Sequence, residues 1–218
     1  MKKIVIFGAG GFGREVLQIV LEGNRTSPAW ECIGFLVDED FPAPAEVHGF
    51  PVLGGIDWLK TRPDVHVVVA VGNPLARKAI VVRINEIGND YATLIHPKAW
   101  LGENVVLGPG AVICAGALIT TDIHLGAHVH VNLGATIGHD SVFGDFVTVS
   151  PGVNVSGGVH LADGVELGSG AVIVPGVSIG EWSVVGANAV VLSKLPRCCT
   201  AVGVPAQVIK QHSENVAG

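Results

Sequence analysis

The sequence predicts two domains: a small α/β domain of the Rossmann-like type over residues 1–90 and an all-β parallel β-helix over residues 91–218. Two observations carry this prediction. From Glu103 the chain divides into fifteen consecutive six-residue blocks, without insertion, and the fifth residue of every block is apolar. Before the repeat, a glycine loop lies between a short apolar run and a helical pattern. A short fixed repeat is the signature of a solenoid, and strands alternating with helices favour a parallel sheet.

The first strand and helix enclose the glycine loop. Ile4 to Phe7 is an apolar run typical of a buried strand, and Gly8, Gly10 and Gly13 follow it in the spacing G-x-G-x-x-G. A helical pattern comes next, so the motif has the strand–turn–helix context that it requires. Such glycines let the backbone approach a phosphate, and the helix N-terminus offers it N–H groups.

The rest of the α/β domain continues the alternation. We expect a second strand over Cys32–Val37 that ends at Asp38, where a carboxylate is placed to accept hydrogen bonds from a ribose. A loop rich in proline and alanine and a short helix around residues 56–60 come next. The pattern then predicts a third strand over Val65–Val71 and a helix over Pro74–Glu86.

Three interpretations of the glycine loop remain open at this point. It fits a nicotinamide dinucleotide site, but about 90 residues make only half of a doubly wound fold. A short α/β domain of this kind can instead hold a nucleoside diphosphate carried by a sugar. The third interpretation is a turn needed only for tight packing of helix on strand.

The repeat itself predicts short flat strands joined by turns, with three blocks to a coil and residues eighteen apart stacked. The small or apolar third residue of each block fits an inner corner, and the fifth points into a continuous core. The fifth residues are Leu107, Ile113, Ile119, Leu125, Val131, Ile137, Phe143, Val149, Val155, Leu161, Leu167, Ile173, Ile179, Val185 and Val191. After Leu192 the frame is lost, a tail packs back, and the last few residues are predicted to lack regular structure.

Composition excludes several classes of function. The formal net charge is −6 and no cluster of Lys and Arg occurs, which argues against nucleic-acid binding. No uninterrupted apolar stretch of about eighteen residues exists, so we expect no membrane insertion. The four cysteines match no metal-binding spacing. The cysteines are therefore predicted to be free thiols in a cytoplasmic protein, and no metal site is expected. No signal peptide is expected, because Met1-Lys2-Lys3 leads straight into a strand.

One histidine stands out among nine. His139 occupies the first position of its block, at a corner, and Asp140 follows it as a partner able to orient the ring. Eighteen residues on, Gly157 occupies the matching corner of the next coil and leaves room for a ligand. Histidine suits proton transfer near neutral pH, so His139 is a candidate general base. In contrast, His124, His130 and His160 fall at the outward fourth position, where solvent or a subunit contact is expected.

The chain also resembles a known family. GAGGFGRE, FLVDED, VAVGNPLARK, LIHP, IGHDSVFGDF and VGVPA occur in this order. This set resembles the bacterial nucleotide-sugar acetyltransferases of the hexapeptide-repeat superfamily, which include bacillosamine-pathway UDP-4-amino-sugar N-acetyltransferases, perosamine N-acetyltransferases and sialic-acid O-acetyltransferases. The resemblance implies a left-handed β-helix, whereas the general preference for right-handed crossovers would point the other way.

The resemblance implies an activity and its ligands. The activity would be acetyl-CoA-dependent acetylation of the amino group of a nucleotide-linked 4-amino-4,6-dideoxy sugar, in polysaccharide or glycan biosynthesis. A homotrimer would bind acetyl-CoA between subunits, with His139 as general base and Asp140 beside it. The implied substrate-binding residues are Gly8, Gly10, Gly11, Phe12, Gly13, Asp38, Gly72, Asn73 and Asn132. Many family members carry histidine where this chain has Phe12, which bears on the nucleotide-sugar that is bound.

The cofactor groove would follow the outer corners of the later coils. The expected acetyl-CoA contacts are Ser156, Gly157, Gly168, Gly186, Ala187, Gly203 and Pro205, together with Thr148, where some relatives carry a histidine that touches the cofactor.

Two alternative functions remain: an O-acetyltransferase of the sialic-acid type, and a nucleotide-sugar- or NAD-binding protein in which the solenoid is a scaffold.

Overall fold

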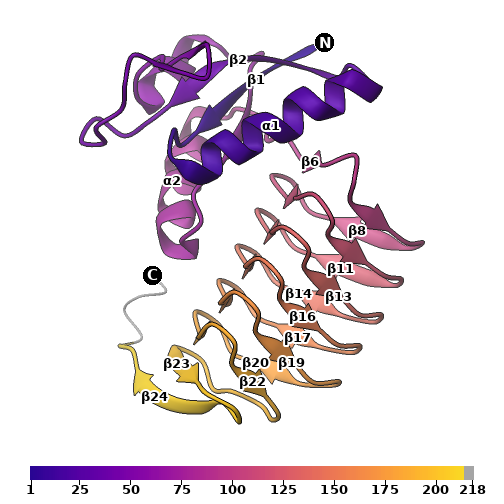
Figure 1. The fold of residues 1–218 in the computed structure, drawn as a ribbon. Coiled ribbons are helices and arrows are strands. Elements are labelled where there is room, and N and C mark those ends of the chain that lie inside the picture. Colours follow the sequence, from indigo (N-terminus) through magenta and orange to yellow (C-terminus); the bar gives the residue numbers. More distant parts are fainter. Residues whose placement is uncertain (214–218) are drawn as a thin grey trace.

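A computed structural model describes residues 1–213. It places a small α/β domain on one end and one side of a stack of β-coils (Figure 1). The predicted order of domains is confirmed: the α/β elements end with α2 and every later element is a β-strand. The prediction for the last few residues concerns 214–218, which lie outside the described part of the chain.

The α/β domain is built on three parallel strands in the order β2-β1-β5. The bounds of β1, β2 and β5 are Lys2–Phe7, Trp30–Leu36 and His66–Val69. Two helices, α1 (Gly11–Thr26) and α2 (Pro74–Ile87), connect or follow them. The third strand is shorter than the predicted Val65–Val71: Val65 precedes it, and Ala70 and Val71 lie in the connection that leads to α2.

Three short elements occupy the connection between β2 and β5. They are β3 (Glu46–Val47), β4 (Phe50–Pro51) and the 3₁₀ helix η1 (Ile56–Thr61). The 3₁₀ helix is the short helix that the sequence predicts.

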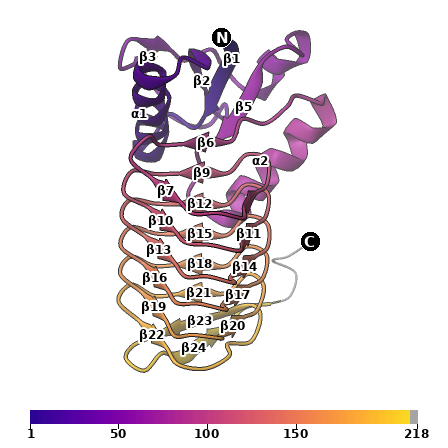
Figure 2. The ribbon, with the colours of Figure 1, turned by 90° about the vertical axis from the view of Figure 1, so that its right-hand side faces the viewer.

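The solenoid consists of three sheets, parallel throughout except for the last strand β24, that form the faces of a prism (Figure 2). We name them by their number of strands: the six-stranded face (β22-β19-β16-β13-β10-β7), the five-stranded face (β20-β17-β14-β11-β8) and the eight-stranded face (β24-β23-β21-β18-β15-β12-β9-β6). Residues eighteen apart pair in register, as Leu118 does with Thr136. The strand bounds are β6 Leu94–Ile95, β7 Trp100–Leu101, β8 Val105–Leu107, β9 Val112–Ile113, β10 Leu118–Ile119, β11 Ile123–Leu125, β12 His130–Val131, β13 Thr136–Ile137, β14 Val142–Phe143, β15 Thr148–Val149, β16 Asn154–Val155, β17 His160–Leu161, β18 Glu166–Leu167, β19 Val172–Ile173, β20 Ser178–Ile179, β21 Val184–Val185 and β22 Val190–Val191.

The repeat dictates the core of the solenoid. Every fifth-position side chain except Leu107 is buried, and so is every third-position residue except Val105. Both exceptions lie in the first block. The repeat therefore predicts the inside of the prism residue by residue.

The second position of each block has a feature that the pattern did not predict. In all fifteen blocks this residue has a positive φ, because the chain turns each corner through a left-handed conformation. Glycine, asparagine and aspartate tolerate that conformation, and they fill twelve of these corners. The other three carry His128, Phe146 and Trp182, which all lie at the edge between the five- and eight-stranded faces.

The tail completes the last coil. Strand β23 (Cys199–Val202) extends the eight-stranded face in parallel with β21, and β24 (Gln207–Gln211) returns antiparallel to it. The expectation that the tail packs back on the solenoid is confirmed.

The α/β domain docks on the eight-stranded face. Arg77 of α2 is fully buried there, and its guanidinium donates to the carbonyls of Val71 and Gly72 in its own domain and to the Phe146 carbonyl and Thr148 Oγ1 of the coil. On the α1 side, His96 Nε2 lies 3.1 Å from Glu22 Oε2. The two contacts fix one domain on the other.

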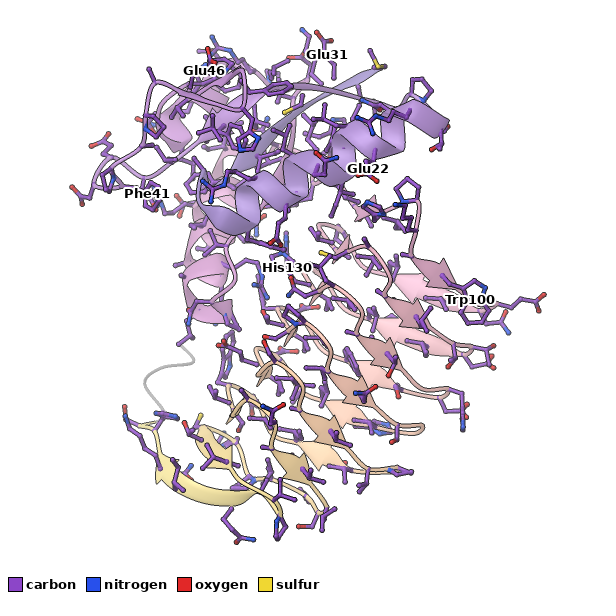
Figure 3. The ribbon with its side chains drawn as sticks, viewed as in Figure 1. Glu22, Glu31, Phe41, Glu46, Trp100 and His130 are labelled. Atoms are coloured by element: carbon purple, nitrogen blue, oxygen red, sulfur yellow. The ribbon has the colours of Figure 1, made fainter. Side chains whose placement is uncertain are left out.

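This docking corrects the expectation for His130. Its side chain points out of the coil, as predicted for the fourth position, but it is only 1% exposed because the α/β domain covers it (Figure 3). The ring packs against Phe12, with the ring centroids 5.0 Å apart. His124 and His160 are exposed, as expected.

Candidate functional site

His139 lies in the turn between β13 and β14, at the edge where the six- and five-stranded faces meet. Its Nδ1 is 2.7 Å from Asp140 Oδ2, and both side chains are about two-thirds exposed. Asp140 has a φ of 60°, the left-handed corner conformation that aspartate tolerates. A carboxylate can only accept a hydrogen bond, so this contact places the proton on Nδ1 and leaves Nε2 as the basic nitrogen.

Gly157 determines where the imidazole can lie. A Cβ added to this glycine would stand 2.7 Å from both Cε1 and Nε2 of His139. The ring therefore rests on the backbone of the next coil, in space that any other residue would fill. The sequence analysis expected Gly157 to leave room for a ligand, but in the structure the His139 ring itself occupies that room.

The glycines of the loop after β1 divide into two kinds. Gly8 has a φ of +112°, and a Cβ on Gly13 would stand against the Gly8 carbonyl, so these two are required by packing. A Cβ on Gly10 would meet nothing within 4 Å, and one on Gly11 would meet only the Arg14 side chain. The open glycines, with the first turn of α1, are therefore the part of the loop that a phosphate can approach.

A pocket of about 380 Å³ lies in front of this loop, lined by the loop backbone, Phe12, Val37, Asp38 and Phe41 among others. A second cavity of about 710 Å³ shares Asp38 and Phe41 with it. At their junction Asp38 Oδ1 accepts a hydrogen bond of 2.6 Å from Arg83 Nη1. The predicted ribose-binding carboxylate thus lies at the pocket and is held by a guanidinium.

Two other predicted substrate residues lie beside the pocket with their polar groups engaged. Asn73 caps α2, its Oδ1 accepting from the Ala76 N–H at 3.0 Å. The Gly72 carbonyl accepts from both Arg77 and Thr148. Val71 and Ala76, on either side of them, line the pocket. The structure therefore places Gly72 and Asn73 in the scaffold of the pocket.

Asn132 lies elsewhere. It follows β12 at the edge between the eight- and six-stranded faces, and its Nδ2 donates to the Val149 carbonyl at 3.0 Å. Within one chain Asn132 and His139 are at different edges of the prism, so a shared contact with substrate would require two chains.

The predicted cofactor residues also divide between two edges. Ser156 and Gly157 share the edge of His139, whereas Gly168, Gly186, Ala187, Gly203 and Pro205 follow strands of the eight-stranded face and lie at its edge with the six-stranded face. A Cβ on Gly168 would stand 2.6 Å from the Ala187 nitrogen, so that glycine is needed for close stacking of coils. One chain does not gather the set into a single groove.

Thr148 departs most from its predicted role. It is 4% exposed under the α/β domain, where its Oγ1 donates to the Gly72 carbonyl at 2.9 Å and accepts from Arg77 Nη2 at 3.0 Å. A hydroxyl so enclosed holds the two domains together, and in this arrangement it has no surface to offer a cofactor.

Comparisons with known proteins agree with both domains. A domain described as the PglD N-terminal domain matches residues 3–84, and the bacterial transferase hexapeptide (six repeats) matches residues 158–193. Among solved structures, WeeI from Acinetobacter baumannii AYE is 30% identical with a TM-score of 0.85, and the match covers 94% of this chain and 99% of that one. This chain belongs to the hexapeptide-repeat family of nucleotide-sugar acetyltransferases.

Other relatives in this family have more descriptive names. The acetyltransferase domain of PglB from Neisseria gonorrhoeae FA1090, in complex with acetyl coenzyme A, is 29% identical over 95% of this chain and 99% of that one, with a TM-score of 0.85. A histidine variant of perosamine N-acetyltransferase from Caulobacter crescentus, in complex with CoA and GDP-perosamine, is 29% identical over 96% and 97%, with a TM-score of 0.87. UDP-N-acetylbacillosamine N-acetyltransferase from Bacillus subtilis (strain 168) is 35% identical over 113 residues, which is half of this chain and half of that protein.

Sequence reasoning missed two arginines of this family member. Arg77 and Arg83 lie on α2 at a spacing of six, so neither the helical pattern nor any motif marked them as a pair. Arg77 lies where the helix faces the coil, and Arg83 lies where it faces the larger cavity. One signal was available. Arg77 lies on the same face of α2 as the buried apolar residues, and a buried cation on such a face needs polar partners such as carbonyl oxygens.

Two further observations concern the described residues. They contain no group of three or more His, Cys, Asp or Glu side chains arranged to hold a metal ion, and no helix among them is long and apolar enough to cross a membrane. All four cysteines are free thiols.

Proposed function

We propose that this protein transfers the acetyl group of acetyl-CoA to the amino group of a nucleotide-linked 4-amino-4,6-dideoxy sugar, with His139 as general base. The proposal rests above all on the contact between His139 Nδ1 and Asp140, because it leaves Nε2 basic at an exposed edge of the coils. The acetyl-CoA and GDP-perosamine complexes of the relatives support the choice of donor and acceptor.

The chemistry needs few groups. The sugar amine attacks the thioester carbonyl, and Nε2 of His139 takes the proton that the nitrogen loses, which contributes ~10²–10⁴-fold to the rate. Asp140 stabilises the imidazolium that forms. The N–H of Gly157, beside the ring, is the proposed donor to the oxyanion. The tetrahedral intermediate then expels the CoA thiolate, which the imidazolium protonates.

Two chains are needed to complete the site. The glycine loop lies over the eight-stranded face, where Phe12 meets His130, whereas His139 lies at the edge between the other two faces. Exposed apolar side chains lie on the two faces that meet at that edge: Trp100 (labelled in Figure 3) and Leu118 on the six-stranded face, and Val106 and Val142 on the five-stranded face. We propose a homotrimer in which His139 of one subunit faces the pocket of the next, with acetyl-CoA between them.

The test is a thiol-release assay with acetyl-CoA and a panel of UDP-, dTDP- and GDP-linked 4-amino sugars. We expect turnover with one of them, and a loss of ~10²–10⁴-fold for His139→Ala. Unchanged turnover in that variant would remove His139 from the mechanism. Acetylation of hydroxyl sugars alone would favour an O-acetyltransferase, and bound nicotinamide in an absorbance scan would favour the NAD-binding alternative.

A further inference from the structure

The larger cavity beside the glycine loop has a distinctive lining. It begins at Asp38 and Phe41, which it shares with the smaller pocket, and extends over Glu39, Asp40, Asp57 and Arg83. Phe41, on the loop after β2 (Figure 3), is 48% exposed and lines both the larger cavity and the smaller pocket. If the diphosphate of the proposed substrate lies on the glycine loop and its ribose at Asp38, the base must lie in this cavity. The inference therefore rests on the proposed function.

The charges around the two cavities support this orientation of the nucleotide, with its diphosphate on the glycine loop and its base in the larger cavity. Carboxylates outnumber cations in the larger cavity, so a diphosphate placed there would be repelled. The glycine loop instead offers backbone N–H groups at the start of α1, whose first turn contains no acidic residue. A neutral, flat base can stack on Phe41 and use the charged groups as hydrogen-bond partners.

The polar side chains of the cavity are of only two kinds. Carboxylates accept hydrogen bonds but cannot donate them, and the Arg83 guanidinium donates but cannot accept. None of the residues that line the cavity is an amide or a hydroxyl residue. Asp38 engages one of the five N–H donors of Arg83, and Lys60 holds Asp57 at 2.9 Å. Glu39 and Asp40, both exposed, therefore remain as acceptors beside the donors of Arg83.

Guanine is the base whose edges match these two kinds of group. Its N1–H and N2–H₂ are adjacent donors that one carboxylate can accept together, and its O6 and N7 are adjacent acceptors that suit the fork of an arginine. We propose that the cavity recognises guanine, with Arg83 on O6 and N7 and Glu39 or Asp40 on N1–H and N2–H₂, so that the acceptor is a guanosine diphosphate sugar.

The other bases fit less well. Uracil and thymine place a carbonyl on each side of a single N–H, so a carboxylate that accepts from the N–H also faces carbonyl oxygens. Adenine and cytosine each have one exocyclic amino group and no ring N–H next to it. A site for those bases would be expected to offer an amide or hydroxyl, which can both donate and accept.

The test is calorimetric titration of the full-length protein with GDP, IDP, UDP, dTDP, CDP and ADP. We expect GDP to bind at least about 10-fold more tightly than the pyrimidine nucleotides, because each mismatch leaves a hydrogen bond to a charged group unmade. IDP lacks only the 2-amino group, so a loss of about 10-fold relative to GDP would locate the carboxylate contact. Arg83→Gln should weaken GDP by about 10- to 100-fold and UDP by clearly less, because UDP loses only the support that Arg83 gives to Asp38, and Arg25→Gln, on the exposed end of α1, should leave GDP binding unchanged.

The results separate this inference from the proposed function. Tighter binding of UDP or dTDP than of GDP, or acetyl transfer to a UDP-linked sugar alone, would overturn the choice of guanine and leave the transferase intact. Equal binding of GDP and IDP, with no effect of Arg83→Gln, would also overturn it. No binding of any nucleotide, together with no acetyl transfer to any nucleotide-linked sugar, would overturn both.

Discussion

At the scale of single residues, the position of the His139 ring depends on the absence of a side chain at Gly157. The imidazole lies where the side chain of residue 157 would be, and Asp140 reaches back to Nδ1 from a left-handed backbone conformation. One neighbour limits where the ring can be and the other fixes its tautomer. The proposed role as general base requires a ring held in this way, because small displacements from the reacting proton are costly in rate.

This arrangement makes Gly157→Ala a sharp probe. The added methyl would stand 2.7 Å from the ring, so we expect it to displace the imidazole and lower kcat by roughly 10- to 100-fold. The backbone N–H remains, and KM for the nucleotide-sugar and the thermal unfolding temperature should change little. Gly23→Ala is the matched control, since a Cβ there meets nothing within 4 Å. Wild-type kcat in Gly157→Ala would show that the ring is not held by this contact.

At the scale of elements, α2 connects the pocket to the coil. Its N-terminal turn follows the loop that lines the pocket, and Arg77 ties this loop to the carbonyl of Phe146 at 2.6 Å. Burial lowers the pKa of Arg77 to about 9, so the guanidinium is still charged at neutral pH. It is therefore a buried charge satisfied mainly by carbonyl oxygens.

Arg77 also donates to Thr148 Oγ1, and changing either residue of this pair should weaken the domain interface. We expect Thr148→Val to lower the free energy of unfolding by roughly 1–3 kcal/mol, because it leaves polar groups unpaired. Arg77→Lys should cost about 3–5 kcal/mol, since an ammonium cannot reproduce the planar fork. Chemical denaturation measures both, with the exposed Arg25→Lys as control. Stability equal to wild type in Arg77→Lys would contradict this account of the interface.

The same interface predicts sensitivity to acid. Burial, reinforced by the charge of Arg77, lowers the pKa of His128 to about 4 and that of His130 well below its usual value. Below pH 6.5, the ordinary pKa of histidine, these residues bind protons in the unfolded chain but not in the folded one, so the free energy of unfolding falls as the pH decreases towards 4. From pH 7 to 5 His128 alone should cost roughly 2 kcal/mol. Burial raises the pKa of Glu166, which acts in the opposite direction.

Urea denaturation at pH 7 and pH 5 tests this effect. His128→Asn keeps a residue that tolerates the left-handed corner and removes the titrating group, so the difference in stability between the two pH values should shrink by roughly 2 kcal/mol. Because Glu166 is present in both proteins, its opposing contribution cancels in the comparison. The same pH dependence in variant and wild type would rule out His128 as its source.

At the scale of the whole molecule, the repeat shows which parts of the fold a sequence can specify. A period of six assigns each position to the inside, the corner or the outside, and this was enough to predict the core and to place His139 at an edge. It says nothing of what covers an outward residue. His130 and Thr148 look like any other fourth-position residues, and only the docked α/β domain makes them buried. The contact of Asp38 with Arg83 was not predicted either, because 45 residues separate the two in the sequence and no local pattern links them.

The geometry of the whole chain also bears on how the site is shared. The pocket and His139 belong to different sides of one prism, so the proposed reaction requires two copies of the chain. A variant that lacks the proposed general base and a variant that lacks the pocket should therefore complement each other within one oligomer. His139→Ala removes the base, and Gly10→Phe fills the pocket at a position where a Cβ meets nothing within 4 Å.

Co-expression of these two variants is the most direct measurement of the central claim. Each alone should have almost no acetyl-transfer activity, but random assembly of the two should restore about a quarter of the wild-type sites, because half of the bases and half of the pockets are intact. Wild type co-expressed with His139→Ala should give about half and calibrates the mixing. Activity of the mixed oligomer that stays at the level of the single variants would place base and pocket in the same chain and contradict the account.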